Sequence, residues 1–128
     1  MSRKTVQRPT VGELAILRVL WTAGPSTVRQ VHYALEGRRR TGYTTTLKLM
    51  QIMAEKGLAR RQSSGFAHVY EAAVGEHETQ RRLVSDLIDK AFGGSARKLI
   101  LQAIQTDRVT AEELKAVRAL LEKEGNKA

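Results

Sequence analysis

Cysteine is absent from this 128-residue chain, and long apolar runs are also missing. The lack of cysteine excludes disulfide bonds, thiolate zinc sites and catalysis by a cysteine nucleophile. The best candidate for an apolar segment, residues 14–21, is eight residues long and is interrupted by Arg18. A run of this length is too short for a membrane span or for the core of an export signal. We therefore expect a cytoplasmic protein that does not insert into a membrane.

Aromatic residues and histidines are few and scattered. The chain has one Trp, three Tyr and two Phe, whereas proteins that bind single-stranded RNA usually display stacking aromatic rings. His32, His68 and His77 are far apart, and none has a second histidine at helical spacing, so a metal site is not expected. Gly93-Gly94-Ser95 lacks the lysine of a phosphate-binding loop, and Ser63 has no histidine–acid pair beside it. We therefore expect no cofactor and no enzymatic activity.

Positive charge is abundant, and it is concentrated in the N-terminal part. The formal net charge is +9. Residues 1–75 carry 12 Lys and Arg against 4 Asp and Glu, whereas residues 76–128 carry 10 against 9. Such an asymmetry predicts a partner rich in negative charge, and nucleic acid is the commonest of these. A basic surface that only aids solubility is the alternative. The Arg38–Arg40 triplet fits either a general attraction to nucleic acid or a solvated loop.

Two helices are predicted at the start of the chain by their capping signals. Thr10-Val-Gly-Glu13 and Thr27-Val-Arg-Gln30 both fit capping boxes, in which the two end residues satisfy each other's backbone amides. The apolar stripes that follow are Leu14, Leu17 and Trp21 in the first helix, and Val28, Val31 and Leu35 in the second. We expect the first helix to end at Gly24-Pro25 and the second near Gly37.

A third helix and a hairpin complete the N-terminal part. The helix should begin near Thr44, with Thr44 and Thr45 available to cap it, and should end at Gly57. Residues 58–62 and 67–72 are typical of short strands, and Ser63-Ser64-Gly65 is typical of the turn between them. Three helices followed by a hairpin is the order of a winged helix, in which the second and third helices form a helix-turn-helix.

The C-terminal residues 76–128 predict short amphipathic helices, with Ser95 and Thr110-Ala-Glu-Glu113 as caps. These helices are too few to enclose a core of their own. We expect them to pack on a second copy of the chain, and folding back on the N-terminal part as a monomer is the alternative. The candidate dimer-interface residues are Leu83, Leu87, Leu99, Ile100, Ile104, Leu114, Val117 and Leu121.

The predicted fold is therefore mostly α-helical with a small β-hairpin. We expect a winged-helix DNA-binding domain over residues 1–75 and a helical dimerisation region over residues 76–128.

The third helix is the candidate DNA reader, because a major groove admits one α-helix whose N-terminal residues touch base edges. Its spacing predicts that Thr46, Leu49, Met50 and Met53 face the core. The opposite face carries the candidate base-reading residues Thr44, Thr45, Lys48 and Gln51, with one threonine capping the helix and the other contacting DNA.

Three arginines are candidate contacts to the DNA backbone. Arg29 lies near the start of the second helix and should meet a phosphate. Arg60 and Arg61 lie on the first strand of the wing, where backbone or minor-groove contact is expected. One of these two must point away, because neighbouring residues of a strand face opposite sides.

Several short motifs, in this order and spacing, carry a resemblance to a known family. They are Ala15-Ile-Leu-Arg-Val-Leu-Trp21, Thr27-Val-Arg-Gln-Val-His32, Tyr43-Thr-Thr, Lys56-Gly-Leu58, Ala67-His-Val-Tyr70 and Phe92-Gly-Gly-Ser95. The chain resembles the penicillinase-repressor family of winged-helix regulators, which includes the BlaI, MecI and CopY regulators. The resemblance runs from about Val11 to Leu121. It implies an N-terminal winged helix, a C-terminal dimerisation region and binding to palindromic operators. It also implies release when a membrane sensor-protease signals cleavage within the dimerisation helices.

The chain departs from the family pattern at several positions. Lys48 stands where the family usually has a threonine, and Ile52 stands where it usually has an arginine. These changes predict a different operator sequence. The bond cut in the beta-lactam repressors joins Asn and Phe, and the aligned candidate for cleavage here is Gln102-Ala103. The C-terminal cysteine hook of the copper-responsive branch is excluded, because the chain has no cysteine.

The resulting hypothesis is a homodimeric repressor that binds a double-stranded DNA operator and has a membrane sensor-protease as a second candidate partner. A basic RNA- or ribosome-associated protein is the main alternative, and a winged helix used for protein interaction is another. Competition between duplex DNA and single-stranded RNA distinguishes these classes.

Overall fold

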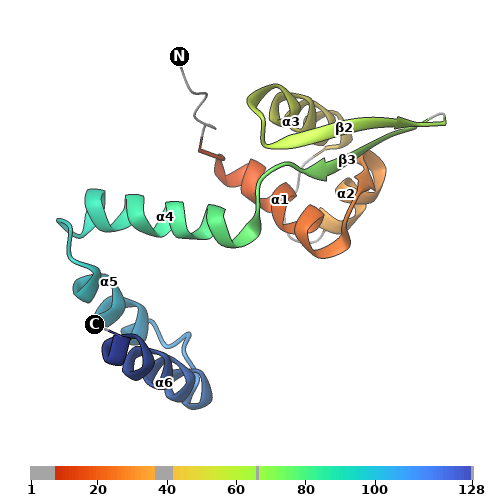
Figure 1. Ribbon diagram of the computed structural model, residues 1–128. Helices are drawn as coiled ribbons and strands as arrows, with labels where there is room; N and C mark the ends of the chain where they lie inside the picture. The colour runs from red at the N-terminus through yellow and green to blue at the C-terminus, as the bar shows by residue number, and fades with distance from the viewer. Residues whose placement is uncertain (1–7, 37–41, 66, 128) are drawn as a thin grey trace. The chain divides into compact units, whose positions relative to one another are not determined.

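The computed structural model describes residues 8–36, 42–65 and 67–127 (Figure 1). Its internal contacts divide the chain into two units, Met1–Gln80 and Arg81–Ala128, and each is described by itself. The predicted end of the second helix at Gly37 and the Arg38–Arg40 triplet lie outside the described residues.

The first two helices begin at the predicted capping boxes. Helix α1 spans Val11–Ala23 and α2 spans Val28–Leu35. At the start of α1, the Glu13 amide donates to Thr10 Oγ1 over 3.2 Å, and the Thr10 amide donates to Glu13 Oε1 over 2.9 Å. Thr27 and Gln30 make the same exchange at the start of α2. Helix α1 ends at Gly24, whose φ of 84° is one that glycine adopts readily.

Helix α3 spans Tyr43–Lys56, and its first turn differs from the prediction. Its N-cap residue is Gly42, and no side chain caps this end of the helix. The expectation that Thr44 or Thr45 caps α3 was therefore wrong. Because the helix begins at Tyr43, both threonines already lie inside its first turn. The predicted stop at Gly57 is confirmed, with φ 85° and ψ 10° in the left-handed conformation.

The sheet has three antiparallel strands in the order β1-β3-β2: β1 is Ser26–Thr27, β2 is Ala59–Ser64 and β3 is Ala67–Ala72. The predicted hairpin is present, but Ser63 and Ser64, expected in the turn, belong to β2 and pair with His68 and Ala67. Pairing with β3 thus prevails over the turn preference of serine. The sequence did not reveal β1, because two residues are too few to show an alternating pattern.

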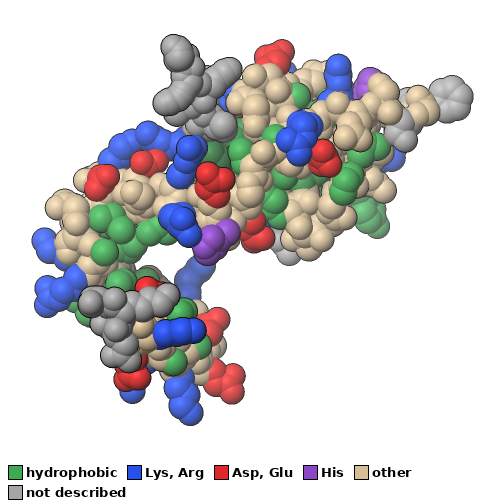
Figure 2. Space-filling view, viewed as in Figure 1, with side chains coloured by type: hydrophobic (Ala, Val, Ile, Leu, Met, Phe, Trp, Pro, Cys, Tyr) green, Lys and Arg blue, Asp and Glu red, His purple; other side chains and the backbone are tan. Residues whose placement is uncertain are grey.

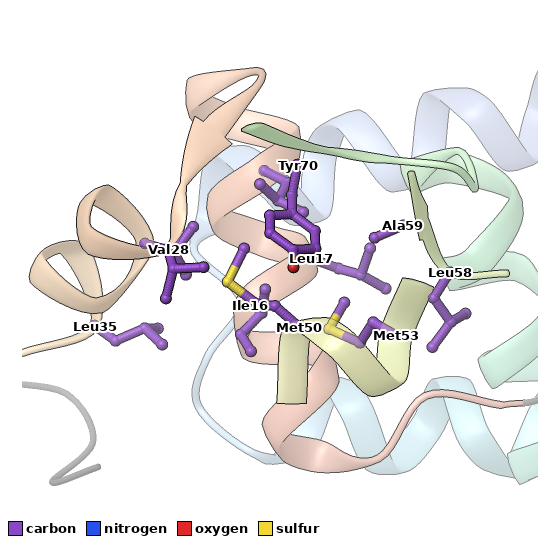
Figure 3. Close-up of a cluster of buried hydrophobic side chains, with 11 residues drawn as sticks. Ile16, Leu17, Val28, Leu35, Met50, Met53, Leu58, Ala59 and Tyr70 are labelled. Carbon is purple, nitrogen blue, oxygen red and sulfur yellow. The ribbon is translucent and has the colours of Figure 1, made fainter. Parts of the chain in front are cut away.

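Helices α1, α2 and α3 and the strands β2 and β3 of the first unit contribute side chains to one apolar core (Figure 3). Its buried members are Ile16, Leu17 and Leu20 from α1, Val28, Val31 and Leu35 from α2, Met50 and Met53 from α3, and Leu58, Ala59 and Tyr70 from the β2–β3 segment. The Tyr70 ring lies among helix side chains in Figure 3 and is 1% exposed. The hairpin is thereby fixed to the three helices.

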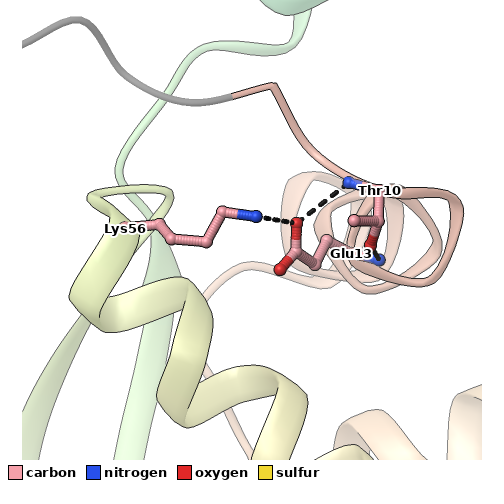
Figure 4. Close-up of polar contacts among 3 residues, drawn as sticks. All are labelled: Thr10, Glu13 and Lys56. Carbon is pink, nitrogen blue, oxygen red and sulfur yellow. Dashed lines mark hydrogen bonds and ion pairs between the residues drawn. The ribbon is translucent and has the colours of Figure 1, made fainter.

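A partly buried ion pair joins the start of α1 to the end of α3 (Figure 4). Lys56 Nζ lies 2.7 Å from Glu13 Oε1, and the Glu13 side chain is only 2% exposed. The same carboxylate oxygen accepts the amide of Thr10, so Glu13 both caps α1 and holds α3. A second long-range contact runs from Trp21 Nε1, which donates to the carbonyl of Val74 over 2.9 Å. It ties α1 to the chain that follows β3.

Helices α4 (Glu76–Ala91), α5 (Ala96–Gln105) and α6 (Ala111–Lys127) form the rest of the chain. Caps at Ser95 and at Thr110 with Glu113 are confirmed by their hydrogen bonds. The first turn of α4 belongs to the first unit, where Thr79 is buried. From residue 81 to residue 124 no side chain is buried, so this part of the second unit has no buried core of its own. Within the described residues, no helix is both long and apolar enough to span a membrane.

Replacing Lys56 by methionine should lower the free energy of unfolding by about 3 kcal/mol, because it leaves the buried Glu13 carboxylate without its counter-ion. Urea denaturation at a fixed protein concentration measures this loss. Lys48→Met is the matched control, since Lys48 is an exposed lysine of the same helix and should change stability by no more than about 0.5 kcal/mol. A loss at Lys56 below about 1 kcal/mol would mean that the pair behaves like an ordinary surface ion pair.

Candidate nucleic-acid interface

One face of α3 is held by the core, and the opposite face is exposed. Thr46, Met50 and Met53 are at most 1% exposed. Helix α3 packs against α1, α2 and β2 on this side. The other side carries Thr44, Thr45, Lys48 and Gln51, and all four are exposed. Two hydroxyls, an ammonium group and an amide therefore lie along one helical face, and these groups can bond to base edges or phosphates.

Arg29, in the first turn of α2, lies next to the start of α3. Its guanidinium carbon is 5.9 Å from the centroid of the Tyr43 ring. The His32 ring meets the same tyrosine edge-on, with a centroid distance of 5.8 Å and an interplanar angle of 84°. Sequence reasoning missed Tyr43 as part of this surface. The ring contacts come from another helix, so the sequence around Tyr43 does not reveal them. The one signal in the sequence was the place of Tyr43 just before the two threonines.

Buried Thr46 connects the two helices from the inner side of this surface. Its Oγ1 lies 3.4 Å from His32 Nδ1 and 3.3 Å from the carbonyl oxygen of Gly42. On its other side, His32 Nε2 lies 3.7 Å from Glu36 Oε2. His32 thus has partners on both nitrogens, and its position is fixed relative to the start of α3.

The two wing arginines have different surroundings. Arg60 pairs with Glu71 across the hairpin, and its Nε lies 3.1 Å from Glu71 Oε2. Arg61 is opposite Tyr70 and so belongs to the other face of the sheet. It is exposed, and among the described residues its side chain has no ion pair or hydrogen bond. The charge of Arg60 is partly neutralised, whereas that of Arg61 is available to an anion.

The histidines do not come together. His68 lies 3.4 Å from Ser63 Oγ on the wing, and His77 is exposed in α4. Across the parts of the chain that the structure describes, no three His, Cys, Asp or Glu residues gather as metal ligands would. The exposed side chains described above therefore form a polar and basic face.

The candidate dimer residues lie on poorly covered helices. Leu87, Ile100, Ile104, Val117 and Leu121 are 38–54% exposed, and Leu83, Leu99 and Leu114 are half-buried. Figure 2 shows apolar side chains at the surface over α4. Three further exposed apolar residues that the sequence reasoning missed are Val84, Leu101 and Leu120. Gln102 and Ala103 are also exposed, and both lie inside α5.

The sequence is similar to known repressors along most of its length. A family model described as penicillinase repressor matches residues 9–123. The transcriptional regulator BlaI of Mycobacterium tuberculosis is 37% identical over 110 residues, which cover 85% of this chain and 79% of that protein. A penicillinase repressor of Staphylococcus aureus is 16% identical over 121 residues, covering 94% of this chain and 95% of that protein.

Two solved structures share the fold of the N-terminal part. The solution structure of the DNA-binding domain of the repressor BlaI has a TM-score of 0.52 and 19% identity, covering 58% of this chain and 90% of that chain. The solution structure of the Bacillus licheniformis BlaI monomeric form, in complex with the blaP half-operator, has a TM-score of 0.51 and 18% identity. It covers 59% of this chain and 93% of that chain. The likeness identifies the fold as a winged helix.

Proposed function

Because the chain belongs to the penicillinase repressor family, we propose that it represses transcription by binding a palindromic DNA operator as a homodimer. The observation that carries this proposal is the exposed polar face of α3, held in place by a buried opposite face. The half-operator bound by the similar Bacillus licheniformis protein supports DNA as the partner. The net charge of +9 supports a polyanionic partner as well.

In this proposal, α3 enters the major groove and its outward face reads bases. Thr44 and Thr45 lie in the first turn, where a reader helix comes closest to the base edges. Each threonine offers a hydroxyl to a base and a methyl group to thymine, and Lys48 can reach a guanine. Gln51 follows on the same face and can bond to adenine.

Contacts to phosphates position the reader helix without specifying sequence. We assign this role to Arg29 on α2 and to Arg61 on the wing. Arg61 is preferred over Arg60, since Arg60 is already engaged by Glu71. Arg60 then contributes to the general positive field of the wing.

The proposed dimerisation is supported by the second unit, in which no side chain of residues 81–124 is buried. Its helices expose Leu87, Ile104 and Leu121 to solvent, and such short helices gain most of their stability from packing. A second copy carries the same apolar stripes, so pairing of the two copies would cover the stripes of each. The dimer would hold its two reader helices about one DNA turn apart, roughly 34–36 Å or a multiple of it.

Relief of repression by proteolysis is the finer part of the proposal. The candidate bond, Gln102-Ala103, lies in the ten-residue helix α5. An isolated helix of this length is marginally stable, so local opening can present its chain to a protease. A cut there would divide the dimer seam without touching the DNA-reading residues. A membrane sensor-protease is the partner that this step requires.

Binding to a labelled random-sequence duplex should weaken steeply with salt, because Lys and Arg side chains displace condensed counter-ions. With about five phosphate contacts per dimer, log K should fall against log salt with a slope of about −4 or steeper. Arg61→Ala should flatten the slope by about one unit per protomer. Arg18→Ala, at an exposed arginine of α1, is the control and should leave the slope unchanged. A gel shift competed by single-stranded RNA more effectively than by duplex DNA would instead support an RNA-binding protein.

Lys48→Ala should alter operator preference, because it removes a group assigned to base readout. On the duplex preferred by the wild type in a random-pool selection, the loss should be about 1–3 kcal/mol, with a much smaller loss on random duplexes. Fluorescence anisotropy on both duplexes measures the difference. Arg61→Ala serves as the comparison and should weaken both alike. Equal losses for Lys48→Ala on the two duplexes would mean that Lys48 contacts only the backbone.

The double substitution Leu99→Asp/Ile104→Asp should separate the dimer, because it places unpaired charges in an apolar seam. Sedimentation at micromolar concentration should show monomers that keep the winged-helix fold. Affinity for a full palindrome should then fall by about 10²–10⁴-fold as the effective concentration of the second reader is lost. The control Gln102→Asp/Gln105→Asp adds the same charges to the opposite side of α5 and should remain dimeric. If the Leu99→Asp/Ile104→Asp variant remains dimeric, these helices do not form the dimer interface.

A further inference from the structure

Three side chains meet where α2 and α3 come together, and we call them the Tyr43 bracket: Arg29, His32 and Tyr43. Arg29 and His32 are three residues apart on α2 and therefore share one face of that helix. Tyr43 is the first residue of α3. The guanidinium of Arg29 lies over the tyrosine ring at 5.9 Å, and the His32 ring meets it edge-on at 5.8 Å. One ring is thus held by two side chains from the neighbouring helix.

Simple burial does not explain this arrangement. Tyr43 is 43% exposed, so its ring gains much less from leaving water than the Tyr70 ring, which is 1% exposed. Arg29 is exposed as well. The face of an aromatic ring attracts a guanidinium, and it also restricts a side chain that would otherwise sample many rotamers in solvent. The ring therefore lies where it can restrict the direction of an exposed cation.

The ring is itself fixed from the inner side of the surface. His32 Nδ1 lies 3.4 Å from the hydroxyl of Thr46, and Thr46 is fully buried in the same helix that begins with Tyr43. The Thr46 hydroxyl also lies 3.3 Å from the carbonyl of Gly42, the residue before Tyr43. A chain of contacts therefore runs from the core through His32 to the Tyr43 ring and on to Arg29.

We propose that Tyr43 is a positioning residue, whose ring holds the Arg29 guanidinium ready for a DNA phosphate beside the start of the reader helix. This inference rests on the proposed DNA-binding function. It adds a physical link between the phosphate contact of α2 and the placement of α3. An arginine held in its bound geometry loses less conformational freedom on binding than a mobile one. Because the contact is to a phosphate, the effect does not depend on operator sequence.

A double-mutant cycle on the full chain tests the proposal, with affinity for a fluorescein-labelled duplex of random sequence as the readout. The proteins are wild type, Tyr43→Leu, Arg29→Ala and the double variant Tyr43→Leu/Arg29→Ala. Tyr43→Phe is the matched control, because it keeps the ring and removes only the hydroxyl. Thermal unfolding of each variant verifies that the winged helix is intact. Random-sequence DNA is sufficient, since no base contact is tested.

Tyr43→Leu should weaken binding about two- to fivefold for each protomer, the size expected of an exposed cation–ring contact. Tyr43→Phe should bind like the wild type. In the Arg29→Ala background, Tyr43→Leu should cause no further loss, because the cation that the ring positions is already gone. This non-additivity is a result that a merely structural role for Tyr43 does not produce.

Other outcomes overturn the proposal. Additive losses in the cycle would mean that Tyr43 acts independently of Arg29. A loss for Tyr43→Phe as large as that for Tyr43→Leu would make the hydroxyl the DNA contact in place of the ring. An unchanged affinity for Arg29→Ala would mean that Arg29 makes no phosphate contact. Failure of the wild type to bind the duplex would refute the proposed function. That result is distinct from the other three, because it is measured on the wild type before any variant is compared.

Discussion

Burial of one face of α3 is the constraint on which the candidate interface depends. Thr46, Met50 and Met53 are enclosed by α1, α2 and β2, so α3 cannot rotate about its axis without exposing apolar surface. Deleting a buried methionine side chain typically costs about 2–5 kcal/mol, which gives the scale of that restraint. With the inner face fixed, the helical period decides which residues point outward. The identity of the polar face thus follows from the packing of its apolar counterpart.

Polar contacts refine the placement that the core establishes. The Glu13–Lys56 pair fixes the end of α3 to the start of α1, while Thr46, His32 and Tyr43 connect the start of α3 to α2. Both ends of the helix are therefore held by specific groups, and its middle is held by apolar packing. A buried ion pair adds little net stability compared with an apolar pair of similar size. Here the pair links the end of α3 to the start of α1.

The two units of the chain differ in how far they bury their apolar residues. Among the residues that the structure describes, the first unit encloses eleven buried hydrophobic residues, whereas the second buries no side chain over residues 81–124. Its helices are nevertheless well capped, at Ser95 and at Thr110 with Glu113. Capping fixes where a helix begins, but it does not cover an apolar stripe. This contrast supports the proposal that the first unit reads DNA and that the second unit associates with a second copy.

The sequence by itself determined the features that depend on near neighbours in the chain. Capping boxes join residues three apart, so Thr10 with Glu13 and Thr27 with Gln30 could be predicted, as could the outward position of Lys48 from the helical period. It did not reveal β1, the extension of β2 through Ser64 or the cap of α3 at Gly42, because strand pairing and helix ends depend on distant partners. Only the tertiary structure decided that Arg60 is paired with Glu71, that the partly buried Lys56 side chain meets the buried Glu13 carboxylate, and that the Tyr43 ring contacts both Arg29 and His32. Each of these contacts joins different elements of secondary structure, and their distances are set by how those elements pack in three dimensions.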